Sequence, residues 1–200
     1  MYVIGLTGSL GTGKSTVASM LKICGANVLD ADAIARRQLY RNSPCFAEVV
    51  RVFGECVLTR QRIDRKKMAA IVFNDRTKLR KLEKIIHPVV RKVIMEGIER
   101  NKNVKKITVV DVPLLFESGL NKRMDYVIVV KAKRNLQIQR AEKKLGISKE
   151  QILKRIKIQM PLSTKIRRAD FIIDNNGSLN QTRKKVDEIW RLINGKISAN

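Results

Sequence analysis

The stretch TGSLGTGKST, residues 7–16, follows the apolar run YVIGL at residues 2–6 and decides the fold of this chain. It contains the pattern G-x-x-x-x-G-K-S, which is the spacing of a phosphate-binding loop between a buried strand and a helix. Such a loop holds a nucleoside triphosphate. Whether its phosphate goes to water, to a protein switch or to a small-molecule acceptor is left open by the loop itself.

The residues of the loop divide the work of binding a triphosphate. Gly8, Gly11 and Gly13 allow positive φ angles, so that backbone N–H groups can close around phosphate oxygens. The following helix directs the positive end of its dipole to the same place. Lys14 can reach the β- and γ-phosphates, and the hydroxyl of Ser15 can ligate Mg²⁺.

Short apolar, β-branched runs recur between helical patterns and lack the alternation of half-buried strands. They are YVIGL (2–6), NVL (27–29), ITVVDV (107–112), YVIVV (126–130) and FIID (171–174). Runs of this kind predict strands buried on both faces, as in a parallel sheet covered by helices. We therefore expect an α/β fold with a five-stranded parallel sheet.

Apolar residues at helical spacing predict a first helix from about Gly13 to Cys24 and a last helix from about Leu179 to Ile193, with Trp190 on the core side. Almost 80 residues separate the second and third strand runs, far more than one crossover needs. Further helix patterns lie there, at Ala33–Tyr40, Cys45–Phe53, Arg65–Phe73, and from Leu79 through His87 and Pro88 to Ile98. The sequence thus predicts an inserted helical subdomain, and a second insertion over residues 134–168.

Carboxylates follow two of the predicted strands. Asp30 and Asp32 come at the end of the second strand, where they could serve proton transfer and metal hydration or could cap the helix that follows. Asp111 ends the third strand and is a candidate neighbour of magnesium, with a structural salt bridge as the alternative. The segment PLLFE at residues 113–117 is a poor helix start and indicates a functional loop.

The composition limits the partners of the chain. Its 42 basic and 18 acidic residues give a net charge of +24, which favours polyanionic ligands. Aromatic residues are only 4% and the basic residues are dispersed, so a dedicated nucleic-acid surface is not indicated, although incidental affinity for polyanions is compatible with the charge.

The cysteines and the apolar runs indicate the compartment. The three cysteines form no C-x-x-C pair, and a single histidine leaves no zinc-binding pattern, so reduced thiols fit best, with Cys24 in the core. No apolar run approaches the roughly 18 residues that span a bilayer. We therefore expect a cytoplasmic protein without a membrane partner.

Seven motifs in order, from Ile4 to about Ser178, resemble the dephospho-coenzyme A kinase family. They are IGLTGxxGxGKST, VLDADAIAR, IDR, IVF, HPVV, DVPLLFESGL and ADFIIDNNGS. The phosphate loop alone would indicate only the P-loop superfamily, whereas DAD, HP, VPLLFE and IDNNGS together narrow the resemblance. What it implies is transfer of the γ-phosphate of ATP to the ribose 3′-hydroxyl of dephospho-CoA, with Mg²⁺, in the last step of coenzyme A synthesis.

The resemblance also implies domains and roles. Residues 1–30, 106–133 and 169–200 are expected to form a nucleotide-binding core of three layers, residues 31–105 a helical acceptor domain, and residues 134–168 a lid. The expected catalytic residues are Asp32 as base, Lys14 and Arg140. ATP is expected to contact Gly8, Gly11, Thr12, Gly13, Lys14, Ser15, Thr16 and Asn175. The acceptor is expected to contact Thr7, Asp32, His87 and Leu115, and the metal Ser15 and, through water, Asp111.

One segment departs from the family pattern. Residues 59–62, TRQR, stand where related sequences usually have an acidic turn that contains glycine. The alternatives to the resemblance are another P-loop kinase acting on a nucleoside monophosphate or metabolite, and an ATP-dependent nucleic-acid-binding protein suggested by the charge.

Overall fold

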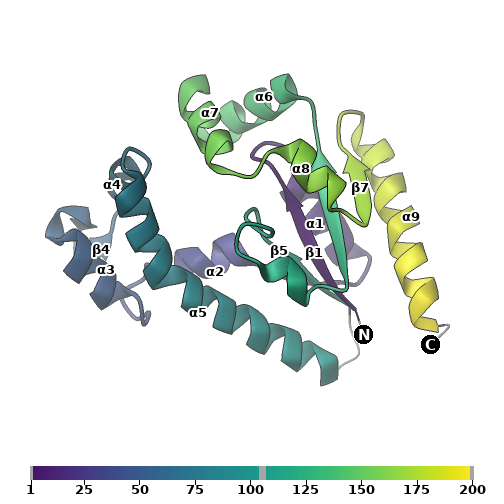
Figure 1. Cartoon of the computed structure of the whole chain (residues 1–200), viewed down its shortest axis with the longest axis horizontal. Helices are drawn as coiled ribbons and strands as arrows, with labels where there is room; N and C mark the ends of the chain where they lie inside the picture. The colour runs from purple at the N-terminus through teal and green to yellow at the C-terminus, as the bar shows by residue number, and fades with distance from the viewer. Residues whose placement is uncertain (1, 104–106, 199–200) are drawn as a thin grey trace. The chain divides into compact units, whose positions relative to one another are not determined.

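The structure, a computed structural model, describes residues 2–103 and 107–198 (Figure 1). The predicted domain boundary between residues 105 and 106 lies outside these ranges. Within them, no helix combines the length and the apolar character needed to cross a membrane.

The chain divides into two compact units. The sheet unit contains residues 1–29 and 98–200, and the helical unit contains residues 30–97. The first junction falls within strand β2 (Asn27–Asp30) and the second within the long helix α5 (Arg76–Asn103).

The sheet unit is an α/β fold with a five-stranded parallel sheet, as the apolar runs predict. Besides β2 and the end of α5, its elements are β1 (Val3–Gly8), α1 (Lys14–Ile23), β5 (Thr108–Asp111), η2 (Leu120–Arg123), β6 (Tyr126–Lys131), α6 (Arg134–Leu145), α7 (Lys149–Ile158), α8 (Leu162–Arg167), β7 (Phe171–Asp174) and α9 (Leu179–Ser198). The strand order is β2-β5-β1-β6-β7, so β1 is central. Its neighbours β5 and β6 both run parallel to it.

Helices α1 and α9 cover one face of this sheet. Alternate strand residues such as Ile4, Leu6 and Ile128 are fully buried against apolar residues of both helices, and Trp190 packs against this core as predicted. Gly5, between Ile4 and Leu6, faces the other side, where an added Cβ would lie 2.6 Å from the side chain of Leu115. Burial of each such aliphatic side chain contributes about 1.5–3 kcal/mol, which makes the sheet a firm base for the loops at its edge.

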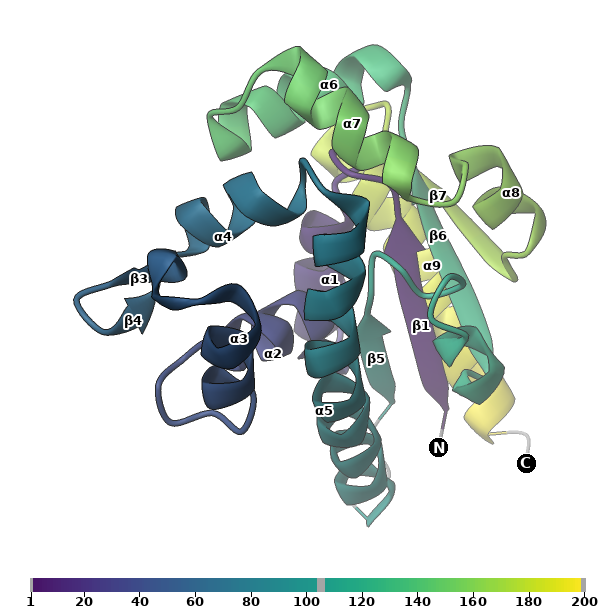
Figure 2. The same ribbon diagram turned by 60° about the vertical axis from the view of Figure 1, so that its left-hand side comes forward.

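The helical unit has its own core. Its elements are α2 (Ala31–Arg37), α3 (Phe46–Phe53), η1 (Glu55–Val57), β3 (Leu58–Thr59), β4 (Arg62–Ile63), α4 (Arg65–Val72) and the first part of α5. In Figure 2, α3, β3, β4 and α4 lie on one side of α5. Apolar residues of α3, η1, β4 and α4 are buried against the side chains that α5 presents at Leu79, Leu82, Ile85 and Val89. The helix patterns of the insertion therefore mark real helices.

The last helix pattern of the insertion, from Leu79 to Ile98, lies within one continuous helix. α5 runs through Pro88, which cannot donate a backbone hydrogen bond to the carbonyl of Lys84. Both Pro88 and Lys84 are exposed, so water can satisfy that carbonyl.

The segment TRQR forms a tight hairpin between β3 and β4. Thr59 pairs with Arg62, and the two residues between them, Arg60 and Gln61, have φ angles of 49° and 59°. Both lie in the left-handed region, which glycine and asparagine adopt at lower cost.

The described cysteines are free. Cys45 is buried, Cys24 is partly buried beside the sheet core, and Cys56 is exposed. Burial raises the pKa of the Cys24 and Cys45 thiols, which keeps them protonated and unreactive.

Candidate active site

The phosphate-binding loop joins β1 to α1. Two of its three predicted glycines have a positive φ, and Gly8 does not, because it is the last residue of strand β1. Gly11 and Gly13 have φ angles of 76° and 87°, in the left-handed region. α1 begins at Lys14, and the N–H of Thr16 donates to the carbonyl of Gly13 at 3.0 Å. The loop therefore lies at the carboxyl end of the central strand, with the positive end of α1 beside it.

Close packing requires glycine at these positions. A Cβ at Gly11 would lie 2.1 Å from the carbonyl oxygen of Gln137 in α6, and one at Gly13 would lie 2.0 Å from Nδ2 of Asn175. A Cβ at Gly8 would meet a backbone oxygen of β6 at 2.7 Å. The loop is thus enclosed by elements more than 100 residues away in the sequence.

Polar side chains form hydrogen bonds with the backbone of the phosphate-binding loop. The hydroxyl of Thr12 donates to the carbonyl of Ser9 at 2.9 Å. Nδ2 of Asn175 donates to the carbonyl of Thr12 at 2.9 Å, and the Asn175 Oδ1 accepts from Thr182 at 2.8 Å. Asn175 is expected from the sequence to contact ATP through adenine. In this conformation its side chain is buried and both polar atoms have protein partners, so the amide holds the loop.

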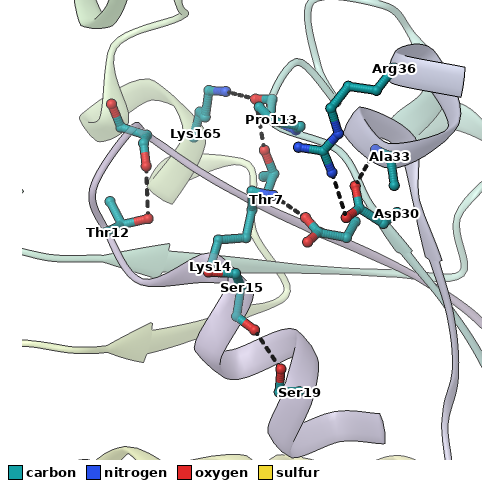
Figure 3. A network of polar contacts seen from close by, with 12 residues as sticks. Thr7, Thr12, Lys14, Ser15, Ser19, Asp30, Ala33, Arg36, Pro113 and Lys165 are labelled. Carbon is teal, nitrogen blue, oxygen red and sulfur yellow. Dashed lines mark hydrogen bonds and ion pairs between the residues drawn. The ribbon is translucent and has the colours of Figure 1, made fainter. Parts of the chain in front are cut away.

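Lys14 and Asp111 meet at the end of the sheet. The ammonium of Lys14 forms an ion pair with the carboxylate of Asp111, which is 6% exposed (Figure 3). Ser15 is exposed, and its hydroxyl accepts a hydrogen bond from Nζ of Lys144 at 3.2 Å. The structure thus brings together the predicted lysine and the predicted metal neighbour Asp111.

Helix α6 lines the loop with basic side chains. A guanidinium nitrogen of Arg140 donates to the backbone carbonyl of Asn175 at 2.9 Å and lies 3.8 Å from the position of a Cβ on Gly13. Lys144, one turn further along α6, reaches Ser15. Sequence reasoning named Arg140 and missed Lys144. The i, i+4 spacing of the two cations on one helix was the signal that could have found it.

Thr7 and Leu115, both expected to contact the acceptor, are fully buried instead. The hydroxyl of Thr7 donates to the carbonyl of Pro113 at 3.1 Å. Leu115 packs against Gly5. Neither side chain presents surface to a ligand in this conformation, because other segments of the chain pack against it.

A second lysine, Lys165 of α8, is completely buried near the site. Its ammonium donates to the carbonyl of Pro113 at 2.5 Å (Figure 3). It also lies 3.0 Å from the carboxylate of Glu117. Burial lowers the pKa of the Lys165 ammonium, the hydrogen bond and charge of Glu117 oppose that shift, and the positive charge of Lys14 adds to it. Sequence reasoning attached no role to Lys165.

The helical unit carries the remaining predicted residues. Asp30 is the N-cap of α2, because its carboxylate accepts from the N–H of Ala33 at 2.9 Å, and it lies 3.7 Å from Arg36 (Figure 3). The helix therefore begins two residues before the predicted Ala33. Asp32 lies in its first turn and is exposed, and His87 is exposed on α5.

A glycine-rich loop on the central strand of a parallel sheet, with lysine and carboxylate at its end, is the triphosphate site of a P-loop protein. The sequence profile of the family described as Dephospho-CoA kinase matches residues 2–181. The chain belongs to this family and is an ATP-dependent phosphotransferase that acts on a hydroxyl group.

Relatives and a solved structure agree with this family. The chain is 44% identical over 193 residues to dephospho-CoA kinase of Symbiobacterium thermophilum, covering 96% of this chain and 81% of that one. It is 44% identical over 191 residues to dephospho-CoA kinase of Aquifex aeolicus, covering 95% and 96%. Its structure is similar to that of dephospho-CoA kinase from Campylobacter jejuni, with a TM-score of 0.72 at 29% identity over 97% of this chain and 98% of that chain.

Proposed function

We propose that the chain transfers the γ-phosphate of ATP to the ribose 3′-hydroxyl of dephospho-CoA and thereby forms coenzyme A. The observation that supports this most is the family match over nearly the whole chain, together with a phosphate-binding loop whose lysine is already paired with a carboxylate at the sheet edge. The family defines the acceptor, since the loop alone would serve any triphosphate.

On the donor side, the loop N–H groups hold the phosphate oxygens. Lys14 moves from Asp111 toward the β- and γ-phosphates when these arrive, because a triphosphate carries more negative charge than one carboxylate. The exchange leaves Asp111 able to accept hydrogen bonds from water at the site. Of the predicted ATP-binding residues, Asn175 and Thr12 act by holding the loop.

The residues present fit a magnesium ion. Mg²⁺ prefers oxygen ligands and keeps several waters, so it needs few side chains beyond the phosphates. The exposed hydroxyl of Ser15 would ligate it directly and Asp111 through water. Among the described residues no group of three or more His, Cys, Asp or Glu side chains could hold a metal alone. When bound, the ion would neutralise charge on the β- and γ-oxygens.

On the acceptor side, Asp32 is the proposed general base. Its carboxylate accepts the proton of the 3′-hydroxyl while that oxygen bonds to the γ-phosphorus and the bond to the β-phosphate oxygen breaks, releasing ADP. The transfer is direct and in line, and no phosphoenzyme forms. Asp32 is exposed, so its carboxylate is accessible to an acceptor.

The basic face of α6 stabilises the transferring phosphoryl group. Arg140 is the predicted cation, and an arginine supplied to this chemistry is worth ~10³–10⁵ in rate. Lys144 lies one turn away on the same helix and contacts the loop through Ser15. We propose that residues 134–168, which form α6 to α8, act as the lid, and that residues 31–105, with His87, bind the acceptor.

The net charge of +24 supports the two proposed substrates, because ATP and dephospho-CoA are both polyanions. A positive field raises the rate of encounter, and salt screens it. The apparent second-order rate constant should therefore fall as salt rises.

The test is an assay of ADP release from ATP with separate additions of dephospho-CoA, nucleoside monophosphates and RNA. Stimulation by dephospho-CoA, with a new 3′-phosphate in the phosphorus NMR spectrum of the product, is expected. Stimulation by a nucleoside monophosphate alone would indicate a different P-loop kinase. Stimulation by RNA alone would exclude the proposed kinase activity.

A further inference from the structure

Residues 159–165, which follow α7 and include the first turn of α8, contact two loops of the site at once. We call this segment the clasp. One loop is the phosphate-binding loop, and the other, residues 112–119, follows β5 and is called the β5 loop. All three segments belong to the sheet unit.

At one end of the clasp, Gln159 holds the tip of the phosphate-binding loop. Its Oε1 accepts hydrogen bonds from the hydroxyl of Ser9 at 3.1 Å and from the N–H of Leu10 at 3.2 Å. The side chain of Leu10 packs against the buried cluster of Ala141, Ile152 and Ile156 in α6 and α7. The tip is therefore held by a single amide oxygen and by apolar packing.

At the other end, Lys165 holds the β5 loop. Its side chain is 0% exposed, and its ammonium contacts the carbonyl of Pro113 and the carboxylate of Glu117. Glu117 also accepts a hydrogen bond from the N–H of Met160 at 2.7 Å, so the clasp contacts Glu117 at two points.

The two ends meet through Pro113. Its carbonyl oxygen accepts from Lys165 and also from Thr7, the residue that opens the phosphate-binding loop (Figure 3). Asp111, the partner of Lys14, stands only two residues before Pro113. A shift of Pro113 would therefore move both the start of one loop and the carboxylate at the end of β5.

A fully buried lysine is a costly way to fill a core. Taking an ammonium out of water costs several kcal/mol, and apolar residues of similar volume are often as stable or more stable. The partner Glu117 is not buried, so this cost falls on Lys165. The ion pair has directional partners, however, which an apolar side chain lacks. This favours a role in fixing the geometry of the two loops over a role in stability alone.

We propose that the clasp sets the position of the phosphate-binding loop relative to the β5 loop during phosphoryl transfer, with Lys165 and Gln159 as its positioning residues. The inference rests on the proposed function and deepens it. It also gives residues 159–165 of the proposed lid a second role, which is to hold the two loops.

The test measures turnover at saturating substrates, ATP affinity and urea unfolding for Lys165→Met and Lys165→Arg. Misplacement by about 1 Å can cost ~10² in rate, so Lys165→Met should lose roughly ten- to a hundredfold in kcat per folded enzyme. Its affinity for ATP should change less than about threefold, since the loop N–H groups remain. Lys165→Arg restores the charge and should recover most of kcat. Lys157→Met, an exposed lysine of α7, is the matched control and should behave as wild type.

A second pair of variants tests the other end of the clasp and serves if Lys165→Met does not fold. Gln159→Leu removes the acceptor, whereas Gln159→Glu keeps an oxygen in its place. Gln159→Leu should lower kcat about tenfold, and Gln159→Glu should lower it much less. Both are measured at saturating ATP, so that an effect of the added glutamate charge on ATP affinity does not change kcat.

The outcomes separate this inference from the proposed function. Normal kcat in folded Lys165→Met and Gln159→Leu, with wild type active on dephospho-CoA, would overturn the clasp alone. A loss of stability with unchanged kcat per folded molecule would also overturn it, because it would show a structural role only. Wild type without activity on dephospho-CoA would overturn the proposed function, and the clasp with it.

Discussion

Asp111 and Asp32 both lie at or just after the carboxyl end of a strand of the same sheet, yet they differ in burial. Asp111 ends β5, is buried and is paired with Lys14. Asp32 follows β2 by two residues and is exposed in the first turn of α2. The buried carboxylate of Asp111 belongs to the sheet unit, whereas Asp32 and His87 belong to the helical unit and are exposed.

The difference indicates how the two halves of the reaction are prepared. A donor site built from loop N–H groups, glycines and a paired lysine is organised before the nucleotide arrives. For Asp32, the proposed base, we expect the exposed carboxylate to act only when the acceptor is bound. Variants at the loop glycines should therefore affect ATP binding and stability together, and variants at Asp32 should affect turnover and leave ATP binding nearly unchanged.

The largest expected effect is that of Asp32→Asn. Loss of a general base should lower kcat by ~10²–10⁴, while the affinity for ATP stays within about twofold. Rapid-quench assays and isothermal titration with an ATP analogue measure the two quantities. Asp30→Asn is the control, since it keeps a capping oxygen and should retain most of its turnover. Near-normal turnover of Asp32→Asn would show that the base assignment is wrong.

The next effect tests whether packing holds the donor site. Gly11→Ala places a Cβ 2.1 Å from a backbone oxygen at a φ of +76°, whereas Gly119→Ala at a φ of +70° meets nothing within 4 Å. Gly119→Ala should cost about 1–2 kcal/mol from backbone strain alone. Gly11→Ala should lower the free energy of unfolding by more than this and should also weaken ATP binding at least tenfold. Urea unfolding measures the first effect and titration with ATP the second. Equal costs at the two sites would refute the view that α6 fixes the loop.

A smaller effect is expected at the hairpin of the helical unit. Arg60→Asn with Gln61→Gly relieves two left-handed residues and should raise the free energy of unfolding by about 1 kcal/mol. The exposed hydrogen bond from Arg41 to Gln61 is lost, but it contributes little. Turnover should not change, because the hairpin carries none of the proposed catalytic residues. A drop in kcat would show that this turn takes part in the site.

The smallest effect concerns Asp64, the N-cap of α4. The N–H groups of Lys67 and Lys66 lower the pKa of its carboxyl. Its contribution to stability is therefore complete above the pKa of an unfolded Asp, about 3.9, and is lost as the pH falls through the lower folded value. The difference in urea midpoint between wild type and Asp64→Asn should be larger at pH 7 than at pH 3. A difference that grows on acidification would contradict the sign of this shift.

Much of the sheet unit was predictable because its signals are local. Five apolar runs predict the five strands of the sheet, and the glycine spacing predicts the loop with its positive φ angles. Both follow from residues within ten positions of one another. The helix patterns of the insertion were likewise local, although α5 passes through Pro88 because the proline faces solvent.

The side chains that hold the loops of the site could not be predicted from local sequence patterns. Gln159 and Asn175 contact the phosphate-binding loop from about 150 residues away, and Lys165 reaches Pro113 across 52 residues. In the sequence Lys165 stands among exposed basic residues of an amphipathic run, and nothing local distinguishes it from its neighbours.

The sequence by itself determined the fold class, the triphosphate site and, through the family, the reaction. Tertiary structure decided which of the predicted site residues are buried and which are exposed. Thr7, Leu115 and Asn175 were expected to contact substrates and are buried, because the same carboxyl edge of the sheet that exposes Ser15 is closed from below by α8, α9 and the β5 loop. Burial depends on what packs against a residue, and that information lies in distant segments of the chain.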